Sequence, residues 1–132
     1  MINTEVVPHY DDTSLPMVKQ YRAAIDRFAP QLPPEASNSG YEVHKNYTFG
    51  SLEGYITAQV YLRILDKVGP ELTREKFITA AEGMGEFDLG VGAPASYSAQ
   101  DHQALDRVWM TYADKDGWKA VDNLATVIKA DE

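Results

Sequence analysis

Cysteine is absent from the 132-residue chain, and this excludes disulfide bonds, thiolate metal sites and cysteine nucleophiles. Long apolar runs are missing too, because no stretch approaches the roughly 18 residues that cross a bilayer. Residues 1–8 contain neither the basic nor the apolar region of a signal peptide. As it stands, the chain is therefore predicted to carry no membrane span and no export signal.

Basic residues are scarce. Lys and Arg number 12 against 20 Asp and Glu, and 12 minus 20 gives a net charge of -8. This charge repels phosphate backbones and anionic lipid surfaces, so a nucleic-acid partner is not expected. Hydrophobic residues make up 44% and charged residues 24% of the chain, which is ordinary for a folded domain. We expect residues 1–132 to form a single unit.

Three helices are predicted. The first has Pro16 in its first turn, Thr13 or Ser14 as cap, and ends before Pro30. Its apolar stripe consists of Val18, Tyr21, Ile25 and Phe28.

The second helix is predicted to start with Ser51 as its cap, to run to about Val68, and to stop at Gly69 and Pro70. Apolar residues cover most of its circumference, so burial on more than one side is expected. The third helix follows a Thr73 cap. Its stripe consists of Phe77, Ala80, Ala81 and Met84, and Gly83 and Gly85 end it.

Short strands complete the predicted mixed α/β fold. A first strand ends at Pro8, residues 86–92 read as a loop, and residues 94–98 read as an edge strand. Alternation in residues 107–112, a turn at 114–117 and a strand at 118–121 predict a C-terminal β-hairpin. The tail from Asp122 fits a strand or a short helix. Residues 30–50, rich in proline and glycine, are predicted to be an exposed connection.

No catalytic or cofactor motif stands out. The chain has no Gly-x-Ser-x-Gly elbow and no complete dinucleotide fingerprint. His9 with Asp11 and Asp12 is the nearest metal-like cluster, but loop aspartates more often serve turns and caps. His102 is read as a turn residue. The sequence therefore indicates neither an enzyme, nor a metal, nor a cofactor.

Aromatic side chains gather around the end of the connection. Tyr41, Tyr47, Phe49 and Tyr55 fall within fifteen residues. Small-molecule pockets are mostly apolar with a few placed polar groups, so such a cluster can line a ligand cleft. Core packing is the better reading for Tyr55, and both readings stay open for Tyr47 and Phe49.

Several segments, read in order, resemble one family. They are residues 15–21 (Leu-Pro-Met-Val-Lys-Gln-Tyr), residues 51–58 (Ser-Leu-Glu-Gly-Tyr-Ile-Thr-Ala), and residues 68–70, 73–77, 87–90 and 97–103, followed by the hairpin turn at 116–117. Together they resemble the C-terminal portion of type I periplasmic solute-binding proteins, the receptors of branched-chain amino-acid ABC transporters.

This resemblance implies a two-lobed extracytoplasmic receptor that closes on a small ligand and presents it to a membrane permease. The connection at residues 30–50 would then contain one passage between lobes, and residues 98–108 the return. Matching the family's ligand-facing segment suggests Tyr47, Phe49, Gly50 and Ser51 as ligand-binding residues. Glu53 is a further candidate, although a carboxylate there also suits the helix dipole.

Two functions remain open at this point. In the first, the chain is part of a non-catalytic receptor that binds an amino acid or a related small carboxylate when complete. In the second, it is an interaction or structural protein that associates with a second copy through exchange of an element. The long connection at residues 30–50 would act as the hinge for that exchange.

Overall fold

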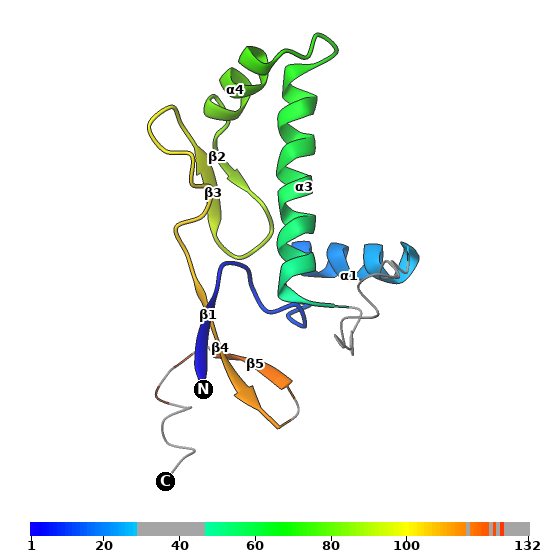
Figure 1. Cartoon of the computed structure of the whole chain (residues 1–132), viewed down its shortest axis with the longest axis vertical. Helices are drawn as coiled ribbons and strands as arrows, with labels where there is room; N and C mark the ends of the chain where they lie inside the picture. The colour runs from blue at the N-terminus through cyan, green and yellow to red at the C-terminus, as the bar shows by residue number, and fades with distance from the viewer. Residues whose placement is uncertain (29–46, 116, 122, 124, 126–132) are drawn as a thin grey trace, which may run out of the picture.

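Figure 1 shows the fold in a computed structural model, which describes residues 1–28, 47–115, 117–121, 123 and 125. A small antiparallel sheet lies at one end, and a larger body of helices with a two-stranded hairpin lies at the other. The sheet consists of β1 (Ile2–Glu5), β4 (Trp109–Asp114) and β5 (Gly117–Val121). The body consists of α1 (Pro16–Phe28), α3 (Phe49–Val68), α4 (Arg74–Glu82), β2 (Gly85–Asp88) and β3 (Pro94–Tyr97). The predicted mixed α/β class with three main helices is confirmed.

The small sheet has the order β1-β4-β5, with every pair antiparallel. The predicted C-terminal hairpin is β4–β5, in which Asp114 lies opposite Gly117. The first strand ends three residues earlier than its predicted end at Pro8, since β1 stops at Glu5. Val7 and Pro8 are buried beyond the strand, so their apolar character reflects packing rather than pairing.

The predicted loop at residues 86–92 is wrong in its first half. Residues up to Asp88 belong to β2, which pairs with β3 so that Phe87 lies opposite Ala95. The rings of Phe87 and Tyr97 also stack at 6.0 Å. Cross-strand contacts stabilise short strands more than intrinsic propensity does. Because Glu86 and Asp88 are polar, the sequence pattern did not indicate a strand here.

The cap of α3 is Thr48 rather than Ser51. The Thr48 side chain accepts from the Ser51 backbone N–H at 3.1 Å, and the Ser51 hydroxyl accepts from the Thr48 N–H at 3.3 Å. This reciprocal pair is a capping box, so Ser51 is its third helical residue. At the other end, Gly69 terminates α3 with φ of 75°, as predicted for a glycine after Val68.

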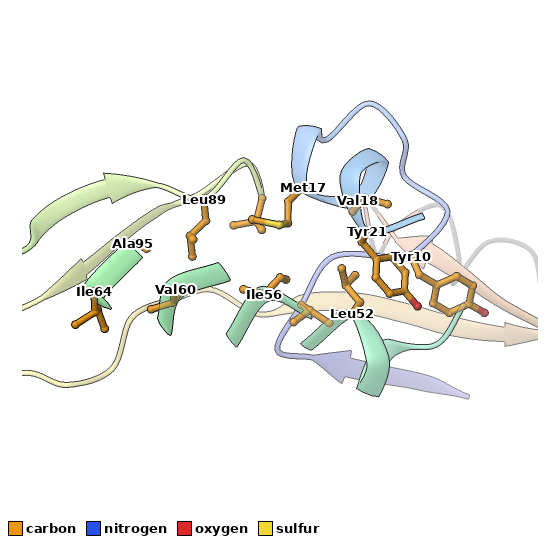
Figure 2. Packing of buried hydrophobic residues seen from close by; sticks show 12 residues of the cluster. Tyr10, Met17, Val18, Tyr21, Leu52, Ile56, Val60, Ile64, Leu89 and Ala95 are labelled. Carbon is orange, nitrogen blue, oxygen red and sulfur yellow. The ribbon is translucent and has the colours of Figure 1, made fainter. Parts of the chain in front are cut away.

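One stripe of α3 forms the centre of the core. Leu52, Ile56, Val60 and Ile64 recur every fourth residue and are all buried. Figure 2 shows them facing Met17, Val18 and Tyr21 from α1 and Leu89 and Ala95 from the β2–β3 region. Each fully buried aliphatic side chain contributes about 1.5–3 kcal/mol. Among the described residues, the fully buried side chains of α3 lie on this one side, while Tyr55 and Tyr61 on its flanks are partly covered by Tyr21 and Phe77, with ring centres 5.8 and 5.2 Å apart.

Two chain segments join the small sheet to the helical body. Residues 6–15, the outgoing passage, follow β1, and residues 98–108, the return passage, precede β4. His9 in the outgoing passage is buried, and its Nε2 lies 2.9 Å from the Trp118 carbonyl oxygen in β5. The Asp11 backbone N–H donates to His9 Nδ1 at 3.1 Å. Since Nδ1 accepts, Nε2 carries the proton and donates to Trp118.

Most of the predicted connection at residues 30–50, and most of the tail after Asp122, lie outside the described residues. The elements on either side of that connection, α1 and α3, contact each other directly. Tyr21 of α1 and Ser51 of α3 are joined by a short hydrogen bond between their hydroxyl groups. Both helices therefore belong to the same body.

Replacing Leu52 by alanine tests the core stripe. Leu52 is 0% exposed, and truncation of a buried leucine leaves a cavity, so we expect a loss of about 2–5 kcal/mol in the free energy of unfolding. Leu62, on the same helix, is 56% exposed and provides the matched control. Leu62→Ala should change the free energy by less than about 0.5 kcal/mol in urea denaturation. Equal losses for the two variants would contradict this assignment of the core.

Replacing His9 by phenylalanine tests the link between the outgoing passage and β5. The ring keeps its shape, but the Trp118 carbonyl and the Asp11 N–H lose their partner, which should cost about 1–3 kcal/mol. His102→Phe is the control, because His102 is exposed and pairs at the surface with Glu82, at 3.1 Å. Its effect should stay within about 0.5 kcal/mol. Thermal or urea denaturation of both variants decides the point, and a silent His9→Phe would rule the link out.

Candidate functional site

A groove opens where the two passages meet α3. Its volume is about 510 Å³. Val6 and Val7 of the outgoing passage line one part, and residues 103–108 of the return passage line another. One face of α3 forms the remaining wall, with Ile56 and Val60 at its apolar part. The groove therefore lies at the junction between the small sheet and the helical body.

Polar groups stand on both walls of this groove. Glu53 and Thr57 belong to α3, while Gln103 and Arg107 belong to the return passage. The Arg107 guanidinium donates to the Gly92 carbonyl oxygen at 2.8 Å, which holds its charge beside the groove. A carboxylate on one wall, a guanidinium on the other and apolar side chains between them suit a small ligand that carries both charge and apolar surface.

Tyr47, a predicted ligand-binding residue, lies at the α1 side of the helical body. Its hydroxyl donates to the Asp26 carboxylate, and the Arg22 guanidinium sits 4.1 Å from its ring centre. The hydrogen bond to Asp26 raises the pKa of Tyr47, while the charge of Arg22 acts in the opposite direction. Its ring also lies edge-on to Tyr21 at 6.0 Å. These contacts tie the start of α3 to α1.

Phe49, the second predicted residue, packs into the outgoing passage. Its ring centre lies 5.4 Å from His9 and 4.9 Å from Tyr10, both at steep angles. Burial, followed by the nearby charge of Asp11, raises the pKa of Tyr10. Phe49 is half-buried and forms with His9 and Tyr10 a compact aromatic group beside the link to β5.

Gly50 and Ser51 have different surroundings again. Gly50 is exposed, and a Cβ at this position would meet nothing within 4 Å. With Glu53 and Thr57 it shares one face of α3, because these residues are spaced by three and four. The Ser51 hydroxyl is occupied by Thr48 and by Tyr21. The four predicted residues therefore lie within residues 47–51 but face different surroundings, and Gly50 alone shares its face with the groove wall.

The residues of the return passage were missed as site candidates. Gln103 is the last residue of the family-like segment at 97–103, which suggested no ligand contact, and Arg107 belongs to no motif. The signal that was available is their position in a predicted passage between lobes, since segments that join two bodies commonly line the site between them. Where the chain is described, His, Cys, Asp and Glu side chains form no group of three that could hold a metal ion. None of the helices in these ranges has the length and hydropathy needed to span a bilayer.

Comparison with known proteins identifies the fold. The profile of the periplasmic binding protein family matches residues 4–118. A search of curated proteins finds no significant match. Among solved structures, a possible leucine/isoleucine/valine-binding protein from Rhodopirellula baltica SH 1 is 33% identical, with a TM-score of 0.76 over 92% of this chain.

A substrate-binding periplasmic protein from Ralstonia solanacearum is 16% identical, with a TM-score of 0.68 over 91% of this chain, and supports the fold alone. The chain spans only 29% of the Rhodopirellula protein and 31% of the Ralstonia protein. The resemblance read from the ordered segments is confirmed, and the chain belongs to the type I periplasmic binding protein family.

Proposed function

We propose that this chain supplies part of a solute-binding receptor and that the groove between α3 and the return passage forms one wall of its ligand site. The observation that carries this proposal is the position of the groove, which both passages line. Closure of a two-lobed receptor rotates its lobes about such connecting segments. A ligand held at this point would contact the parts that move relative to each other.

The groove walls favour an amino acid or a related small carboxylate. Glu53 can pair with an ammonium group, and Arg107 with a carboxylate. Ile56, Val60 and Leu89 would contact an apolar side chain. The 33% identity to a possible leucine/isoleucine/valine-binding protein supports the same ligand class.

The N-terminal end of α3 is proposed to complete the site. The backbone N–H of Gly50 belongs to the first turn, where amides have no partner within the helix, and such amides suit a ligand carboxylate. The other predicted residues would support that turn or contact the ligand directly. The supporting contacts are those of Tyr47 with Asp26, of Phe49 with Tyr10, and of Ser51 with Thr48. The role is binding without catalysis, as expected of a family of receptors.

The cellular context follows from the family as part of the same proposal. A complete receptor would act outside the cytoplasm and deliver its ligand to the permease of an ABC transporter. This chain alone should bind weakly, because one wall of a cleft covers too little of a ligand.

Isothermal titration tests the ligand site in two forms of the protein. One is this chain alone, and the other is a chimera in which it replaces the matching segment of the Rhodopirellula protein. Leucine, isoleucine, valine, phenylalanine and benzoate serve as probes. The chain alone should show no saturable heat below about 1 mM, and the chimera should bind one probe at about micromolar Kd. Micromolar binding by the isolated chain would contradict the proposal of an incomplete site.

Substitution of Glu53 tests the ammonium contact in that chimera. A hydrogen bond to a charged group contributes about 1.5–3 kcal/mol, so Glu53→Gln should weaken binding of the preferred amino acid by about tenfold to a hundredfold. Glu75→Gln, an exposed change in the first turn of α4, is the control and should leave Kd unchanged. If the two variants bind equally well, Glu53 has no role in the site.

A further inference from the structure

The hydroxyl group of Tyr21 lies at the first turn of α3, although the residue belongs to α1. Its oxygen accepts from the Thr48 backbone N–H at 3.0 Å and forms a short hydrogen bond with the Ser51 hydroxyl. The Ser51 oxygen lies farther from the same N–H, at 3.3 Å. The nearer acceptor for the cap N–H therefore comes from the neighbouring helix, and the capping box of α3 is completed across two helices.

The ring of Tyr21 fixes the place of this hydroxyl. The side chain is 0% exposed. Its ring centre lies 6.0 Å from that of Tyr47, just before α3, and 5.8 Å from that of Tyr55, in the second turn of α3. Aromatic pairs at such separations attract each other. The ring is thus held between the residue before the cap and the turn after it, with its oxygen at the cap.

The turn that Tyr21 closes leads directly into the groove wall. In an α-helix the N–H of residue 53 bonds to the carbonyl of residue 49, so the backbone at Glu53 is helical only while the first turn is closed. The Glu53 carbonyl oxygen in turn accepts from the Thr57 hydroxyl at 2.9 Å, and both residues line the groove. Helix ends open more readily than helix centres. A stronger cap therefore keeps both polar groups of this wall in place.

We propose that Tyr21 is a positioning residue of the ligand site. By closing the first turn of α3, its hydroxyl holds the Glu53 carboxylate at the groove wall, where that carboxylate meets the ammonium group of an amino acid. Tyr21 is buried and does not line the groove, so it acts without touching the ligand. This inference rests on the proposed function, which assigns the ammonium contact to Glu53, and adds a dependence of affinity on a hydroxyl group in α1.

Native-state hydrogen exchange of this chain tests the closing of the turn without a ligand. Tyr21→Phe keeps the ring and removes the hydroxyl. Loss of a cap contact increases opening about threefold to tenfold, so the Leu52 and Glu53 amides should exchange faster by that factor. Exchange is followed at several low urea concentrations, because only local opening is insensitive to urea. Tyr61→Phe, at a half-exposed tyrosine of the same helix, is the control and should leave these local rates unchanged.

Calorimetry with leucine and the chimera tests the consequence for binding. Tyr21→Phe alone should raise the Kd about threefold to tenfold, since the carboxylate is in place for a smaller fraction of the time. In a chimera that already carries Glu53→Gln, the same change should alter the Kd by less than about twofold, because no carboxylate is left to position. Tyr61→Phe should leave the Kd unchanged in both backgrounds.

Two results would overturn the inference alone. One is local exchange of the Leu52 and Glu53 amides that Tyr21→Phe does not change. The other is an equal rise of Kd in the presence and absence of Glu53→Gln, because Tyr21 would then act on the fold as a whole. A leucine Kd that does not respond to Glu53→Gln would instead contradict the proposed function, and with it the ligand role of Tyr21, whatever the exchange rates are.

Discussion

Burial of the stripe from Leu52 to Ile64 is the constraint on which the other elements depend. The four residues of this stripe contact α1 on one flank and the residues around β2 and β3 on the other. Neither α1 nor a two-stranded hairpin can bury enough apolar surface to be stable alone. The helix therefore acts as their common support, and its two ends are fixed independently, by the Thr48 capping box and by Gly69.

Different faces of α3 then contribute to stability and to the candidate ligand site. The stripe from Leu52 to Ile64 holds the body together, and the face with Gly50, Glu53 and Thr57 borders the groove. A helix of a small independent domain would need only the first of these faces.

Prediction from the sequence succeeded where local chemistry decides the outcome. Gly69, Thr73 and the turn before Gly117 mark element ends through backbone preferences that act within a few residues. It failed at β2, because the polar residues Glu86 and Asp88 form a strand only through pairing with β3. The groove could not be predicted either, since residues 53–57 and 103–107 meet only after the chain has returned from β3. Burial of α3 on further sides was expected because apolar residues cover most of its circumference, and Tyr55 and Tyr61 on its flanks are partly covered by Tyr21 and Phe77.

The hydrogen bond between His9 and Trp118 makes the two positions unequally tolerant of substitution. On one side it uses an imidazole whose two nitrogens both have partners, so position 9 admits few replacements. On the other side it uses a backbone carbonyl, which every amino acid provides. Mutations can accumulate at position 118 without altering the contact, while a single change at position 9 removes it. During divergence of such receptors, the attachment of β5 to the outgoing passage can thus persist although one of its two residues changes freely.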